Sequence, residues 1–201
     1  MLKSKITTVY EKHNCQRICQ GDILRDVQFY IIGKGSAQVD LKFPYVIVIS
    51  QDCDLEEGEK KKVAKPTPEG LIEFNQYLPN ILILPAFPAE LVKQGEHLKE
   101  LFSVKPVNIG SDLWKFIKKN SDPRYQFLHS DVALQIPEMV IDFKIHYSVP
   151  FCYFEEKYKK FYLATINELF RERLSQRFFS YLNRIGLPNI KTLSMSVEEA
   201  Q

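Results

Sequence analysis

The strongest structural signal in this 201-residue chain is the stretch Tyr45-Val46-Ile47-Val48-Ile49-Ser50-Gln51-Asp52-Cys53-Asp54-Leu55. Its first five residues are apolar and rich in β-branched side chains, a composition typical of a strand buried on both faces. The strand passes directly into a run of compact polar side chains. Because functional groups gather where rigid strands end, residues 50–54 are the first candidate site.

Further strands and turns are predicted on both sides of this stretch. Loose alternation of apolar and polar residues predicts a half-buried strand at 37–43, and residues 22–32 predict a strand with a mixed face. The continuous apolar run at 81–84 predicts a second buried strand. A Gly-containing turn is expected at 33–36, and Pro44 is expected to interrupt the chain between two strands. The mixed acidic and basic run at 56–68 is typical of a solvated loop.

The second half of the chain predicts helices and short strands in alternation. Helices are expected at 89–102, 111–117 and 166–185, and strands at 125–129 and 141–147. The last helix has the clearest period, with Leu174 and Phe178 on its apolar side. Thr165 and Glu168 are spaced as a capping box before it. Residues 191–201 are expected to form a flexible tail.

The order of these elements resembles the MazF/PemK-type toxin ribonucleases. The matching segments are Gly21-Asp22-Ile23, Pro44–Ser50 and Ile81–Pro85. The resemblance implies an α+β fold, with an SH3-like antiparallel β-barrel core at about 20–150, helical insertions and a C-terminal amphipathic helix in one domain, 1–190. Those ribonucleases carry an Arg before the Pro-initiated strand; here only Lys42 could replace it, as a point charge without the planar fork.

The run after the buried strand offers a set of candidate catalytic residues. Ser50 and Asp52 would lie at the strand mouth, while Asp54 and His129 would transfer protons. Cys53 is a candidate nucleophile, although its two Asp neighbours disfavour the thiolate. Asp52 and Asp54 could also share a divalent cation. The alternative is a tight turn in which the Asp side chains bond backbone amides and Cys53 fills a gap in the core.

The cysteines and histidines leave a metal site open as a second reading. His13, Cys15, Cys19 and Cys53 could hold a structural zinc ion, although their spacing matches no standard knuckle. The alternative is that the cysteines are ordinary small residues, with Cys152 buried. His97 and His146 are expected to be solvated. No Gly-rich phosphate loop is present, so the sequence supports no nucleotide cofactor.

Composition and charge bound the functional classes. With 45% hydrophobic and 26% charged residues the chain is expected to be globular, and its net charge of +2 disfavours a protein coated in nucleic acid. Local basic groups remain, including Lys42 and the run Lys60, Lys61 and Lys62, which Glu residues dilute. We expect no signal peptide and no membrane span, and therefore a cytoplasmic protein.

Three functional hypotheses follow. The first is a divergent bacterial toxin or defence protein that binds RNA and cleaves it, with Lys42 stabilising charge on phosphate. The second is a non-catalytic barrel module that binds a protein partner, such as an antitoxin, or a second copy of itself through the 166–185 helix. The third is a cysteine- or metal-centred enzyme. The first hypothesis rests on the fold resemblance, and fold does not fix function.

Overall fold

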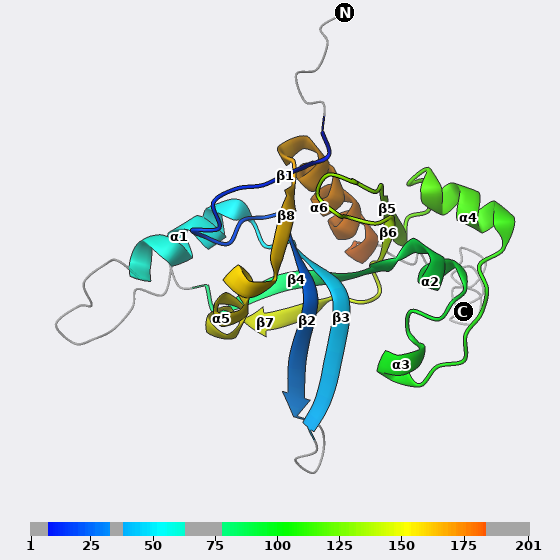
Figure 1. The fold of residues 1–201 in the computed structure, drawn as a ribbon, viewed down its shortest axis with the longest axis horizontal. Helices are drawn as coiled ribbons and strands as arrows, with labels where there is room; N and C mark the ends of the chain where they lie inside the picture. The colour runs from blue at the N-terminus through cyan, green and yellow to red at the C-terminus, as the bar shows by residue number, and fades with distance from the viewer. Residues whose placement is uncertain (1–7, 33–37, 63–77, 184–201) are drawn as a thin grey trace, which may run out of the picture.

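The fold is an antiparallel sheet with helices packed against it. A computed structural model describes residues 8–32, 38–62 and 78–183 (Figure 1). The sheet has eight strands in the order β1-β8-β2-β3-β4-β6-β5, and β7 pairs with β4. The strands are β1 (Tyr10–Glu11), β2 (Asp22–Ile32), β3 (Gln38–Val48), β4 (Asn80–Pro88), β5 (Tyr125–Leu128), β6 (Met139–Asp142), β7 (Tyr147–Pro150) and β8 (Tyr162–Ile166). The helices are α1 (Asp52–Lys62), α2 (Ala89–Lys93), α3 (Lys99–Phe102), α4 (Ser111–Lys118), α5 (Phe151–Phe161) and α6 (Glu168–Leu182).

Strand β3 lies between β2 and β4 and separates two hydrophobic cores. Val46 and Val48 belong to one core, and Ile47 and Ile49 to the other; all four are at most 1% exposed. Because successive strand residues point to opposite faces, a strand with a core on each side needs a continuous apolar run. The prediction that this strand is buried on both faces is confirmed.

The predicted interruption at Pro44 is wrong, because β3 runs through it from Gln38 to Val48. Proline has no N–H to donate, and the β2–β3 ladder omits the Asp26–Pro44 pair while it keeps the pairs on both sides. Asp26 takes a left-handed backbone with a φ of 58°. The inward pattern changes phase here, so that Phe43 and Val46 share one core.

The α+β class is confirmed, and the sheet is an open path. Among the described residues, strand pairing runs from β1 to β5 without a ladder that joins the two ends. A side chain does connect them, since the Tyr10 hydroxyl donates to the His129 carbonyl oxygen at 2.6 Å. The barrel itself therefore stays a prediction. No described helix is both long and apolar enough to cross a bilayer.

One loop prediction and one helix prediction need correction. Residues 52–62 form helix α1, where the sequence predicted a polar turn and the start of the charged loop at 56–68; residues 63–68 lie outside the described residues. The expected helix at 89–102 is split into α2 and α3 at Gly95, whose φ is 71°. A Cβ at Gly95 would lie 2.1 Å from the Val107 carbonyl oxygen, so the chain can turn there only with glycine.

The C-terminal half also departs from the prediction in two places. The expected strand at 141–147 is divided into β6 and β7, because the Ile145 N–H bonds the Asp142 carbonyl and closes a turn. Helix α6 forms as expected with Leu174 and Phe178 buried, but Asn167 is its N-cap. Thr165 lies in β8 instead of capping the helix. The predicted helix end, the 191–201 tail and the 33–36 turn lie outside the described residues.

Candidate functional site

The candidate site at residues 50–54 begins where β3 ends. The Ser50 hydroxyl accepts the Leu82 N–H at 2.8 Å, which holds the strand end against β4. Two residues later α1 starts, so Asp52 and Asp54 lie in the first turn of a helix, where acidic side chains favour its N-terminal dipole. The predicted turn is therefore the start of a helix, and the Ser50 side chain is engaged in a hydrogen bond between the end of β3 and β4.

Asp52 is held in an ion pair from outside the run. Arg17 donates to both of its carboxylate oxygens, at 2.8 and 3.2 Å, and the Gln20 N–H donates at 3.1 Å. Partial burial alone would raise the pKa of Asp52, but the bonds from Arg17 and Gln20 outweigh it and hold the pKa below its usual range. Asp52 is thus an ionised anchor for residues 17–20 and a poor proton acceptor near neutral pH.

The other predicted catalytic residues are arranged differently. Cys53 and Asp54 are exposed, and the Cys53 thiol lies 3.6 Å from the Gln51 amide oxygen. The idea that Cys53 fills a core gap is therefore wrong. His129 is an exposed residue after β5, with its ring against Phe127 at 5.1 Å between centroids. No contact in the described part of the chain joins His129 to residues 50–54.

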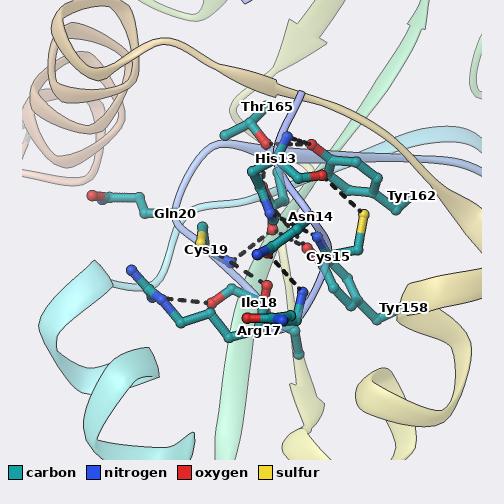
Figure 2. A network of polar contacts seen from close by, with 12 residues as sticks. His13, Asn14, Cys15, Arg17, Ile18, Cys19, Gln20, Tyr158, Tyr162 and Thr165 are labelled. Atoms are coloured by element: carbon teal, nitrogen blue, oxygen red, sulfur yellow. Dashed lines mark hydrogen bonds and ion pairs between the residues drawn. The ribbon is translucent and has the colours of Figure 1, made fainter. Parts of the chain in front are cut away.

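A buried network next to this run escaped the sequence analysis (Figure 2). Asp22 is 0% exposed, and four donors reach its carboxylate. These are His13 Nε2 at 2.9 Å, the Cys19 N–H at 2.7 Å, the Tyr158 hydroxyl at 2.8 Å and the Thr165 hydroxyl at 2.6 Å. The network joins the segment before β2 to α5 and β8. Only the Gly21-Asp22 pair was visible in sequence, since the partners lie up to 143 residues away.

The tautomer of His13 follows from its hydrogen-bond partners. The Cys15 N–H donates to His13 Nδ1 at 3.1 Å, so Nδ1 carries no proton and Nε2–H donates to Asp22. The donor atoms of His13, Cys19 and Asp22 lie within 4.8 Å of one another. Burial, together with the Asp22 charge, raises the pKa of the Cys19 thiol to about 11. Because a metal needs the thiolate and a free imidazole nitrogen, these donors fit the hydrogen-bonded network better than zinc.

Two cavities flank the β2–β3 hairpin, which lies between β7 and α5 on one side and α2 and α3 on the other (Figure 1). The first, here the Lys42 cavity, measures about 450 Å³, and Lys42, Glu96, His97 and Lys99 supply its charged and titratable lining. The second, the aromatic cavity, measures about 580 Å³ and is lined by Phe29, Tyr30, Phe43, Tyr147 and Tyr153 among others. Of the predicted nucleic-acid residues Lys42 is thus at a cavity, and the Lys60–Lys62 side chains lie outside the described set.

His97 is the unexpected member of the Lys42 cavity. Its side chain is only 6% exposed, so the prediction of a solvated histidine is wrong. Neither ring nitrogen has a hydrogen-bond partner, and Nε2 lies 3.8 Å from an Asp142 oxygen. Asp142 is 0% exposed, and its carboxylate accepts hydrogen bonds from Nε and Nη2 of Arg124 and from the Lys144 N–H. Burial alone would raise the Asp142 pKa, but the Arg124 guanidinium, the nearby His97 ring and the Lys144 N–H together hold it below its usual range.

Comparison with known proteins identifies no family for this chain. No protein-family model matches the chain, and no curated protein matches it at a significant level. The function therefore has to be argued from the residues that the fold brings together.

Proposed function

We propose that this chain binds RNA and that a backbone phosphate of the RNA occupies the Lys42 cavity. Two lysines from separate elements, Lys42 on β3 and Lys99 on α3, line the cavity, and both are exposed. Positive side chains are the groups that proteins use to hold phosphate, and such contacts supply most of the affinity for single strands. Glu96 lines the same cavity and offsets part of this charge.

The observation that carries the proposal is that neither ring nitrogen of the buried His97 side chain makes a hydrogen bond. Buried polar atoms in folded proteins nearly always have a hydrogen-bond partner, so a buried imidazole whose nearest carboxylate lies 3.8 Å away calls for an explanation. Both ring nitrogens have less than 1 Å² of accessible surface, so a phosphate oxygen in the cavity would accept a hydrogen bond from the ring only once the side chain turns toward it. An Asp142 oxygen lies 3.8 Å from Nε2 of the same ring. The pair Arg124–Asp142 holds this carboxylate in place.

The proposal favours binding over cleavage by residues 50–54. Ser50 and Asp52 are occupied by structural contacts, and His129 contacts neither of them in the described structure. Cleavage by a toxin-type nuclease would need catalytic side chains outside residues 50–54. His97 would be the first of these side chains to test. We keep the divergent SH3-like barrel as part of the same proposal, supported by the Tyr10–His129 bond between the two ends of the sheet.

The test is the affinity for a fluorescent single-stranded RNA at low salt, measured by anisotropy. Lys42→Met, Lys99→Met and His97→Phe should each weaken binding about tenfold, because each removes a charge-assisted contact. Lys115→Met is the matched control, since Lys115 is 72% exposed and paired with Asp112 on α4. Equal affinities for all four variants, or no binding by the wild-type chain, would overturn the proposal. Gel analysis of the same mixtures reports any cleavage.

A further inference from the structure

The second cavity holds a concentration of aromatic rings that the phosphate site does not use. Five rings from four elements line it: Phe29 and Tyr30 on β2, Phe43 on β3, Tyr147 on β7 and Tyr153 on α5. We propose that a nucleobase of the bound RNA stacks in this aromatic cavity. This inference rests on the proposed RNA binding, and it specifies single-stranded RNA as the substrate class.

The rings differ in exposure and are tilted relative to one another. Phe43 is 1% and Phe29 5% exposed, and their centroids are 6.0 Å apart with the ring planes at 52°. Tyr147 lies 5.3 Å from Phe43, and Tyr153 lies 6.0 Å from Phe29. Tyr30 is 49% exposed. The flat face of a nucleobase can stack on an exposed ring such as that of Tyr30. This contact tolerates any sequence because every base has a π-face.

The charges around the cavity favour a nucleotide over an apolar peptide. Lys157 Nζ lies 4.8 Å from the centre of the Tyr153 ring, so a cation stands beside the stacking surface. On β3 the two cavities share one segment: Leu41 and Phe43 line the aromatic cavity, and Lys42 and Pro44 line the Lys42 cavity. Because successive residues of a strand point to opposite faces, the two cavities lie on opposite sides of β3. In the described sheet, residues 41–44 have no β4 partner, so a single strand of RNA would reach both sites by passing around this edge of β3.

Cys152 provides a reporter inside the aromatic cavity. It lies at the start of α5, lines the cavity and is exposed, contrary to the sequence prediction. Cys53 is the other exposed thiol among the described residues. Cys15 and Cys19 are half-buried, and burial raises the pKa of both thiols, which slows their reaction. In a Cys53→Ser variant, Cys152 is thus the thiol that a neutral maleimide modifies first.

The experiment measures the rate of maleimide modification of Cys53→Ser protein with and without saturating single-stranded RNA. Stacking predicts that RNA slows the reaction at Cys152 at least about fivefold, and that Tyr30→Ala or Tyr153→Ala weakens RNA binding about tenfold. Inorganic phosphate and an oligonucleotide with abasic positions should give no protection. The same reaction at Cys53 in a Cys152→Ser variant should be unaffected by RNA, which controls for a general effect on thiols.

The outcomes separate this inference from the proposed function. If RNA binds and Lys42→Met weakens it, but Cys152 reacts at the same rate, the base site is wrong and the phosphate site stands. If the abasic oligonucleotide protects as well as RNA does, the base site is also wrong. If no RNA binds, both proposals fail. Protection by an apolar peptide in place of RNA would overturn the base site and mark the cavity as a protein-docking site.

Discussion

Two aspartates near the end of β3 differ in what holds them. Asp22 is fully buried and bonded by four donors from three parts of the chain, whereas Asp52 is partly exposed and depends on Arg17 and one N–H. Both lie where the sequence suggested chemistry or a turn. Their contacts make them structural, because a carboxylate whose lone pairs are already occupied has little capacity left to take up a substrate proton.

Replacing Asp52 should destabilise the fold in a pH-dependent way. Asp52→Asn removes the charge that Arg17 and Gln20 bind, and should cost about 1–2 kcal/mol at pH 7. Because the folded-state pKa is depressed, the contribution is complete above the ordinary aspartate pKa of about 3.9 and is lost as pH falls below it. Urea unfolding of both proteins between pH 7 and 3 measures this.

Asp54 is the control for that prediction. It occupies the same first turn of α1 but is exposed, so Asp54→Asn should change stability by less than about 0.5 kcal/mol. A difference between wild-type and Asp52→Asn protein that stays constant across the pH series would show that the ion pair with Arg17 contributes nothing.

Thr165 tests the buried network. Thr165→Val keeps the shape of the side chain but removes the hydroxyl that donates to Asp22 at 2.6 Å and bonds Tyr162 at 2.9 Å. Leaving a buried carboxylate short of one donor should cost about 1–3 kcal/mol in the free energy of unfolding. Thr165→Ser retains the hydroxyl and should cost clearly less. Equal losses for the two variants would mean that packing of the methyl group, and not the bond to Asp22, is what matters.

At the scale of elements, α6 is fixed by one arginine as well as by its apolar face. Arg177 donates to the carbonyl oxygens of Asn120, Asp122 and Tyr125, at 2.6, 2.7 and 2.8 Å. Arg177→Met should therefore lower the free energy of unfolding by about 2–3 kcal/mol, since three backbone acceptors lose a charged donor. Arg173→Met, on an exposed position of the same helix, is the control. Chemical denaturation in which both variants unfold alike would contradict this role.

Periodicity in the sequence predicted the elements whose burial is local, and missed those that depend on distant partners. The continuous run at 45–49 placed β3, and the spacing of Leu174 and Phe178 placed α6. Phe154 and Tyr158 sit one helical turn apart in α5, a signal that was present but overlooked. The spacing of Thr165 and Glu168 fits a capping box, which is why Thr165 was predicted to cap the helix. In the structure Thr165 lies in β8 and its hydroxyl donates to Asp22 instead.

The candidate site was predicted less well than the fold, for a physical reason. Residue types at a strand end show that polar groups gather there, but not which of these groups make structural contacts within the fold. Asp52 is held in an ion pair with Arg17, and His97 is buried beside Asp142, which lies 45 positions further along the chain. Lys42 was identified from a family resemblance, and the structure places it in the lining of a cavity.

For the whole molecule, a net charge of +2 means that RNA affinity should come from few contacts. With Lys42, Lys99 and His97 as the phosphate contacts, the logarithm of the affinity should fall against the logarithm of salt concentration with a slope of about −2, at about −0.7 per contact. Lys42→Met should reduce the slope by about 0.7. Anisotropy titrations from low to physiological salt measure it. A much steeper slope that Lys42→Met leaves unchanged would place the binding elsewhere, and the basic run Lys60–Lys62 would be the first region to mutate.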